Sequence, residues 1–220
     1  MTKRDKLKAH LQRYGFFRTA FWLLMRGASS FLGFNLFVVR TSLTPKTLDN
    51  PCRLANLDYR RLDTDEALRW TEDTELELDP EISRSALERG DILFGAFDGS
   101  RLISYIWRSV SCAPHSDEVW VRVARPYCYS YKSFTRPDYR GQRIVPALIL
   151  YSDQEMLKDG YTHRAGYVDV SNFASLAMAG PMGSEHIGHA GFLQWFGRCF
   201  SFRTKPIRDI GFEFFGRRSD

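Results

Sequence analysis

The chain contains 220 residues, of which 44% are hydrophobic and 15% aromatic, and it carries a formal net charge of +5. A chain of this length can bury a sizeable core, and the absence of repeats and low-complexity tracts argues against disorder. The four cysteines lack C-x-x-C spacing, so the sequence predicts neither a zinc site nor a disulfide framework. Reduced thiols are typical of a cytoplasmic protein, which is the location we expect.

The positive charge is concentrated at the N-terminus. Residues 1–48 hold four lysines and five arginines against the single acid Asp5, a net of +8, which leaves −3 for the remaining residues. Apolar residues recur in this segment at spacings of three and four, which predicts a basic amphipathic helix bent at Gly15. We therefore divide the chain into a basic amphipathic N-terminal segment, residues 1–48, and one folded domain, residues 49–220. The apolar stripe consists of Leu7, Leu11, Tyr14, Phe17, Phe21 and Met25.

Two interpretations of the N-terminal helix remain open. Residues 1–30 can bind an anionic membrane surface on its inner, cytoplasmic face, with aromatic side chains at the headgroup boundary and cations against the lipid. Alternatively, the helix packs on the folded domain or on another subunit. Arg26 interrupts the apolar run, which disfavours a transmembrane span, and the run is too short for a signal peptide. No nucleic-acid-binding motif accompanies the basic segment, so we expect no nucleic-acid partner.

Regular elements are predicted from residue 57 onwards. The pattern indicates a strand, two short helices and a hairpin around Asp98-Gly99, a dipeptide that suits a tight turn. Two further strands follow, and the second one alternates tyrosines with smaller or polar residues. In chain order, these elements are the strand 57–62, helices 64–71 and 81–89, strands 92–97 and 102–110, and strands 119–123 and 127–135.

The stretch from Tyr139 to Leu150 joins a glycine-containing turn to an amphipathic helix that ends at Gly160. The first N–H groups of a helix lack intrahelical partners and carry partial positive charge, so residues 141–145 can bind a pyrophosphate. Pro146 fits this position because its missing N–H falls in the first helical turn. Beyond it we predict a strand over 165–170, a short helix over 173–179, and an antiparallel pair formed by 191–203 and 210–215. The sequence His186-Ile-Gly-His189 is expected in a glycine-rich loop.

Two short motifs carry a resemblance. Arg140-Gly141-Gln142-Arg143-Ile144, followed by Asn172-Phe173-Ala174-Ser175, resembles the coenzyme A signature of the GNAT acyltransferase superfamily. The similarity covers roughly residues 57–215. It implies an α+β fold with a central mixed, mostly antiparallel sheet of six to seven strands and helices on both faces, here preceded by the basic helix. The domain 49–220 then becomes a GNAT-like acyltransferase domain.

The resemblance also implies which residues hold the cofactor. A Gln/Arg-x-x-Gly-x-Gly/Ala turn binds the coenzyme A pyrophosphate in this superfamily, and Arg140 stands at its first position. Arg143 and Val145 replace the two small residues. Main-chain pairing of the pantetheine arm maps to the strand before the turn, and Asn172 matches an asparagine that contacts the cofactor. The implied cofactor-binding residues are Ser133, Phe134, Thr135, Arg140, Gly141, Gln142, Arg143, Ile144, Val145 and Asn172.

The catalytic residues are less clearly marked. Many GNAT enzymes place a tyrosine seven residues after that asparagine as the acid for the leaving thiolate, but this chain has Ala179 there. Tyr131 and His186 lead the candidate replacements. The other candidates are Tyr129, Tyr167, Asp169 and His189. Glu185 is the one obvious additional ligand near the two histidines, so we expect no metal.

The implied reaction is direct transfer of an acyl group from acetyl-CoA or a longer acyl-CoA to an amine or hydroxyl acceptor. Family analogy and the basic segment together suggest a membrane-linked, envelope-sugar or amino-acid substrate. The competing hypothesis is a non-catalytic GNAT-like module that binds acyl-CoA or docks a partner, which the missing tyrosine favours.

Overall fold

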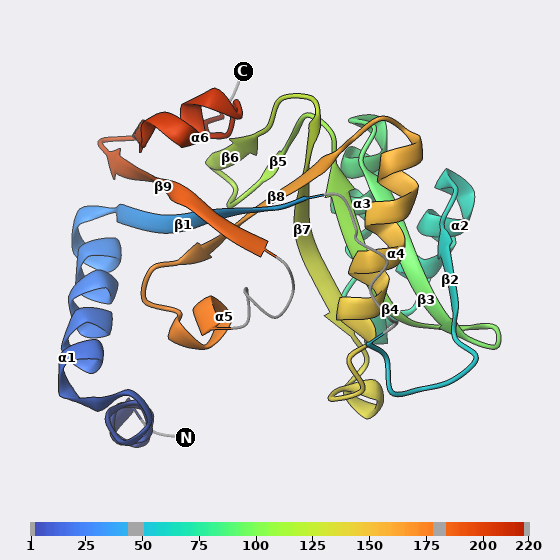
Figure 1. The fold of residues 1–220 in the computed structure, drawn as a ribbon, viewed down its shortest axis with the longest axis horizontal. Helices are drawn as coiled ribbons and strands as arrows, with labels where there is room; N and C mark the ends of the chain where they lie inside the picture. The colour runs from blue at the N-terminus through green and yellow to red at the C-terminus, as the bar shows by residue number, and fades with distance from the viewer. Residues whose placement is uncertain (1–2, 44–50, 178–183, 218–220) are drawn as a thin grey trace.

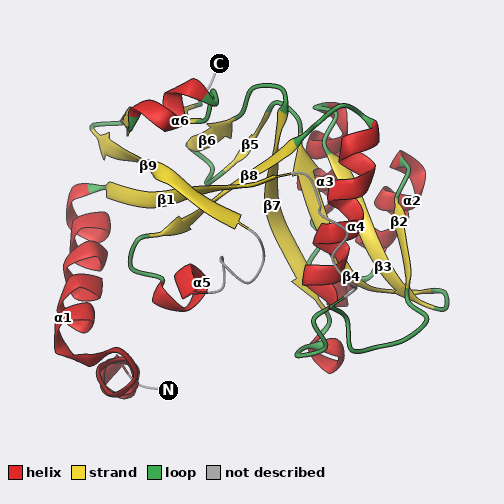
Figure 2. Cartoon of the chain, viewed as in Figure 1, coloured by secondary structure: helices red, strands yellow, loops and turns green. Residues whose placement is uncertain are grey.

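A computed structural model describes residues 3–43, 51–177 and 184–217. Figure 1 shows the elements in chain order, and Figure 2 shows how helices and strands are distributed. The helices are α1 (Lys3–Leu32), α2 (Thr64–Arg69), α3 (Pro80–Glu88), α4 (Ile144–Lys158), α5 (Phe173–Ala177) and α6 (Lys205–Asp209), with 3-10 turns at Trp70–Glu72, Thr74–Leu76 and Pro137–Tyr139. The strands are β1 (Phe34–Leu43), β2 (Asp58–Arg61), β3 (Ile92–Asp98), β4 (Arg101–Ser109), β5 (Cys112–Pro114), β6 (Val119–Arg122), β7 (Tyr127–Thr135), β8 (His163–Asp169), β9 (Ser184–Trp195), β10 (Arg198–Arg203) and β11 (Glu213–Gly216).

The described strands form two sheets. Eight of them make the large sheet in the order β10-β9-β1-β8-β7-β4-β3-β2, and three make a small sheet in the order β11-β6-β5. Every pair in the large sheet is antiparallel except β7 with β8. The prediction of an α+β fold with a mixed, mostly antiparallel central sheet is therefore confirmed, but the large sheet has eight described strands where six to seven were expected.

Helices cover both faces of the large sheet. On one face, α4 packs Leu148 and Met156 against apolar residues of β3, β4 and β7. On the opposite face, α2 and α3 contribute Ala67 and Ala86 to a separate core cluster. Aspartates begin both of those helices: Asp63 accepts the N–H of Glu66 and Asp79 that of Ile82, which satisfies two N–H groups that have no intrahelical partner.

The C-terminal strands differ from the prediction. The segment 191–203 was expected to pair with 210–215, but it turns back on itself at Phe196 and Gly197, so β9 pairs with β10. The strand β11 pairs instead with β6 in the small sheet. The His186–His189 stretch, expected in a loop, lies within β9 because its backbone pairs with β1. Hairpin turns are predicted from Asn-Gly or Asp-Gly pairs, so a turn that begins at Phe196 was not predicted.

The N-terminal segment contributes a helix and a central strand. The helix α1 bends at Gly15 (φ 78°, ψ 176°), as predicted. The strand β1 was not predicted; it lies between β8 and β9 and pairs antiparallel with both. The division of the chain at residue 48 stays a prediction. The strand β1 precedes residue 48 in the sequence but belongs to the large sheet. Within the described part of the chain, no helix combines the length and the apolar character needed to cross a bilayer.

Candidate functional site

The two parallel strands separate after a short contact. Pairing of β7 with β8 covers three residue pairs, from Tyr127 with His163 to Tyr129 with Ala165. Beyond these pairs, residues 130–135 of β7 have no strand partner on the β8 side among the described residues. The unpaired edge includes Ser133, Phe134 and Thr135. Their backbone groups on this edge can pair with an extended ligand, as the resemblance implies.

A β-bulge bends β7 at the same level. On its other edge, Tyr131 pairs with Trp107 and Ser133 with Ile106, which leaves Lys132 as an extra residue with φ of 36°. The Lys132 ammonium donates to the carbonyl of Glu77 at 3.1 Å. Because a bulge bends its strand and increases the local twist, it helps to move β7 away from β8.

A cavity of about 500 Å³ occupies the space beside this gap. It adjoins a smaller cavity of about 270 Å³ at the turn before α4, since Val145 and Pro146 line both. Strands β1, β7, β8 and β9 and helices α4 and α5 all contribute to its wall. The residues lining the larger cavity are Arg40, Ser42, Ser130, Val145, Pro146, Arg164, Gly166, Tyr167, Val168, Ala174, Ser175 and Ser184.

The turn before α4 and the first residues of that helix form an open hollow, which we call the cradle and which comprises residues 140–146. Gly141 has φ of 81°, and a Cβ built on it would meet no atom within 4 Å. Arg143 stands at the N-cap in the left-handed conformation (φ 60°, ψ 31°) and makes no capping hydrogen bond with its side chain. Arg143 thus has a backbone conformation typical of glycine, and it stands at the position where the resemblance expects a glycine. The first N–H groups of α4, those of Ile144 and Val145, have no intrahelical partner, and both residues line the smaller cavity.

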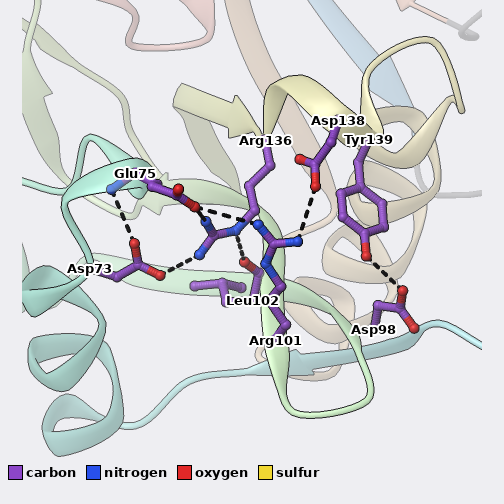
Figure 3. Close-up of polar contacts among 8 residues, drawn as sticks. All are labelled: Asp73, Glu75, Asp98, Arg101, Leu102, Arg136, Asp138 and Tyr139. Atoms are coloured by element: carbon purple, nitrogen blue, oxygen red, sulfur yellow. Dashed lines mark hydrogen bonds and ion pairs between the residues drawn. The ribbon is translucent and has the colours of Figure 1, made fainter.

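Buried Arg136 fixes the chain at the end of β7, just before the cradle. Its Nε donates to the carbonyl of Leu102 at 2.7 Å, and its two terminal nitrogens pair with Asp73 and Glu75. Figure 3 shows these contacts of Arg136 and the neighbouring ion pair, in which Nη1 of Arg101 and Oδ2 of Asp138 are 3.0 Å apart. Because Arg136 joins β7 to β4 and to the turn before α3, it restrains the start of the cradle.

The larger cavity has an excess of positive charge. Arg40 donates to the carbonyls of Ser175 and Leu176 at 3.2 and 2.8 Å, and it forms no ion pair with the described residues. Its Nε and the hydroxyl of Ser42 are buried without a hydrogen-bond partner among those residues. Arg164 shares Asp153 with a second arginine, Arg108. These surroundings favour an anionic or strongly polar group of a ligand.

Asn172 has a local structural role. Its Oδ1 accepts the N–H of Ser175 at 3.1 Å, at the start of α5. Arg140, at the first position of the motif, donates through Nε to the carbonyl of Thr135 at 3.1 Å. The backbone carbonyl of Gln142 accepts a hydrogen bond from the backbone N–H of Arg53 at 2.9 Å. These bonds hold the motif residues in place around the cradle, and Ala179 lies outside the described residues.

The two leading catalytic candidates occupy different environments. The Tyr131 hydroxyl donates to Asp91 at 2.7 Å, and burial, together with that carboxylate, raises the pKa of Tyr131 far above its usual value. His186 is exposed on β9, its Nε2 lies 3.1 Å from the Gly188 carbonyl, and its backbone pairs with that of Arg40. His186 therefore lies near the rim of the larger cavity, whereas Tyr131 already has a partner.

Tyr167 was named as a candidate from the sequence, but its partner, His115, was missed. Nδ1 of His115, just after β5, lies 2.5 Å from the hydroxyl of Tyr167, a residue that lines the larger cavity. Burial raises the pKa of Tyr167 to about 12 and lowers that of His115. The Tyr167 ring stacks on Tyr129, which stacks on Tyr131. No spacing in the sequence connects His115 with Tyr167, because the contact joins the two sheets.

Comparison with known proteins gives structural neighbours only. No protein-family model matches the sequence, and no curated protein matches it. A GNAT-family acetyltransferase from Colwellia psychrerythraea is 13% identical with a TM-score of 0.47, over 78% of this chain and 56% of that one. An aminoglycoside acetyltransferase from an uncultured soil metagenomic sample, in complex with trehalose, is 16% identical with a TM-score of 0.40, over 57% and 86%.

A third neighbour is aminoglycoside N-acetyltransferase AAC(6')-Iy in complex with CoA. It is 17% identical with a TM-score of 0.44, over 59% of this chain and 92% of that one. These neighbours are acetyltransferases of the kind that the sequence resembles. Because each of these three TM-scores is below 0.5, we infer function from the geometry of this chain. Among the described residues, no group of three or more His, Cys, Asp or Glu could hold a metal ion.

Proposed function

We propose that the protein transfers an acyl group from a coenzyme A thioester to an amine or hydroxyl acceptor by direct attack. The observation that carries this proposal is the separation of β7 from β8 immediately beside the cradle of α4. An unpaired strand edge suits the amide groups of a pantetheine arm, and the N-terminus of a helix suits a pyrophosphate. The shared lining of the two cavities brings these features together.

The chemistry needs few groups from the protein. The thioester carbonyl must be polarised, the acceptor must lose a proton, and the leaving thiolate must gain one. Tyr131 and His186 remain our candidates from the sequence. Tyr167, also a candidate from the sequence, lines the larger cavity and is held by His115, which favours it as the acid. Cys128 is buried and burial raises its pKa, which disfavours a thiolate nucleophile and an acylated enzyme.

The cofactor assignment is tested by thermal melting with and without acetyl-, octanoyl- and palmitoyl-CoA. A ligand that binds the native state alone raises the melting temperature. We expect Gly141→Val to remove this shift, because a side chain would enter the cradle. The matched control is Gly90→Val: Gly90 has φ of 82° and equally open surroundings, but it follows α3. No shift with any thioester, or equal loss of shift in both variants, would refute the assignment.

An acyl-transfer assay with a panel of amines and hydroxyl compounds distinguishes the enzyme from a binding module. We expect release of free coenzyme A that depends on the acceptor. A thermal shift without turnover of any acyl-CoA would instead favour the non-catalytic module that the missing tyrosine suggests. Peripheral attachment to the inner membrane face is a separate proposal, which is developed below for the N-terminal helix.

A further inference from the structure

The helix α1 has one face on the domain. Met25 is buried in a cluster with Val38 of β1 and Val170, which follows β8. Trp22 stacks on His10 at 4.6 Å, and His10 contacts the ring of Phe173 in α5. The part of α1 beyond Gly15 therefore contacts β1 and α5, as the packed-helix interpretation expected.

A second, apolar face of α1 points into solvent. Phe17, Leu24 and Phe31 are 86%, 68% and 87% exposed. Their spacing of seven residues places them on one line along the helix, away from the face of Met25. The stripe predicted from the sequence is thus divided, because Met25 faces the domain while Phe17 faces outward. Exposed apolar surface of this extent marks an interaction site.

The β9–β10 hairpin extends this surface. The N–H of Gln194 donates to the carbonyl of Gly33 at 3.0 Å, so the hairpin tip lies beside the C-terminal end of α1 (Figure 1). At that tip, Trp195 is 50% exposed and Phe196 is 90% exposed. We define the apolar face as Phe17, Leu24, Phe31, Trp195 and Phe196.

The conformation of the tip is unusual for its sequence. Phe196 and Gly197 both have positive φ, 48° and 70°, as the two central residues of a type I′ turn require. Asn, Asp or Gly is usual at the first of these positions, whereas a bulky residue there is strained. An aromatic ring kept in a strained turn and exposed to solvent points to a role in binding.

The charge around the apolar face favours an anionic surface over a second copy of this chain as its partner. The helix α1 contains seven lysines and arginines against one aspartate, and Arg198 follows the hairpin tip. Arg4, Lys8, Arg13 and Arg26 are all exposed. A second copy docked through α1 would bring two such cationic helices together, whereas an anionic surface attracts them.

We propose that the apolar face inserts into the headgroup region of an anionic lipid bilayer, with the hairpin tip and α1 as one binding surface. The aromatic side chains enter the boundary between headgroups and acyl chains, and the flanking cations bind the lipid phosphates. This proposal is independent of acyl transfer, because none of the five residues lines the cavities.

Cosedimentation of the full chain with vesicles tests the proposal. We expect binding to phosphatidylcholine vesicles that contain phosphatidylglycerol, weaker binding to pure phosphatidylcholine, and loss with added salt. Phe196→Asn should weaken binding about tenfold or more, since the ring no longer enters the lipid. Asparagine tolerates the left-handed conformation, so this variant keeps its fold. Lys8→Gln should weaken binding about fivefold.

The control removes an exposed apolar side chain elsewhere. Ile82 is 48% exposed on α3, at the opposite end of the large sheet from α1 (Figure 1), so Ile82→Ser should leave vesicle binding unchanged. Absence of binding to anionic vesicles, or binding that Phe196→Asn and Leu24→Ser leave intact, would overturn the proposal. So would a dimer, seen by light scattering, that these substitutions dissociate, because the apolar face would then belong to a second copy.

Discussion

Nδ1 of His115 and the hydroxyl of Tyr167 are 2.5 Å apart, and this contact joins the small sheet to the strand that borders the cavity. The rings of Phe37, Phe192 and Phe214 surround His115 at 5.3 to 5.6 Å. The imidazole and the neighbouring Tyr129 hydroxyl together hold the Tyr167 hydroxyl in place. A tyrosine held in this way beside the cavity is suited to give a proton to a leaving thiolate.

Tyr167→Phe should lower turnover by about 10²-fold or more if this hydroxyl is the acid, with little change in acyl-CoA affinity. The ring and its stacking on Tyr129 are kept, so folding should be retained. Steady-state kinetics and a binding titration separate the two effects. Full activity in Tyr167→Phe would exclude the residue as the acid.

Tyr131→Phe and His186→Ala test the candidates from the sequence in the same assays. Each should lower turnover by about 10²-fold or more if that residue handles a proton, and each should leave cofactor affinity nearly unchanged. Tyr131→Phe also removes a hydrogen bond to Asp91, so its melting temperature must be measured alongside. If both variants keep full activity while Cys128→Ala loses it and an acylated enzyme is trapped, direct attack is wrong.

Stability should depend on His115 in mildly acidic solution. Burial lowers its pKa in the folded state, so below about pH 6.5 the unfolded chain binds more protons than the folded one. The free energy of unfolding therefore falls as pH is lowered through this range. His115→Gln should reduce the slope, measured by urea unfolding at a series of pH values. An unchanged slope would show that the pKa of His115 is the same in the folded and unfolded chain.

Arg143→Gly should increase the free energy of unfolding by about 0.5–1 kcal/mol. The left-handed conformation at Arg143 costs about 1–2 kcal/mol for a residue with a Cβ, and the greater flexibility of an unfolded glycine offsets part of the gain. Chemical denaturation measures the difference. The same substitution removes a cation beside the cradle and should weaken acyl-CoA binding, which calorimetry can detect. A loss of stability would contradict the assignment of strain.

Asp153→Ala should destabilise the fold by about 3–5 kcal/mol, because it leaves the fully buried Arg108 without its carboxylate. Arg164 loses the same partner. The control lies on the same helix: Glu155 pairs with Lys158 at the surface, so Glu155→Ala should have a much smaller effect. Equal effects of the two substitutions in urea denaturation would show that burial of the pair does not matter.

Elements with local signals could be predicted from the sequence. The β3–β4 hairpin and the boundaries of α3 and α4 follow from turn residues and caps close in the chain, although the turn is centred on Gly99 and Ser100, one residue later than predicted, because Asp98 pairs with Arg101. The cradle was found because its glycine, its proline and the apolar face of α4 are consecutive. The strand β1 was missed because its partners lie more than 100 residues away, as the pairing of Phe34 with Leu193 illustrates.

The candidate site could be predicted only in part for the same reason. The backbone edge of β7 and the cradle belong to one continuous stretch, so the motif located them. The separation of β7 from β8 and the contact of His115 with Tyr167 arise from the assembly of distant strands. The spacing of residues in the sequence does not predict such long-range contacts. Arg40 and Ser42, whose Nε and hydroxyl lack a hydrogen-bond partner among the described residues, come from β1 and were therefore absent from the predicted site.

The position of β1 also sets the order in which the protein can be completed during synthesis. This strand leaves the ribosome before both neighbours that it pairs with, β8 and β9, which are made more than 100 residues later. Until then its backbone groups stay unpaired and the apolar side chains beside it stay accessible. Such a nascent chain is open to aggregation and to capture by chaperones, and the sheet can close only after β8 and β9 have emerged.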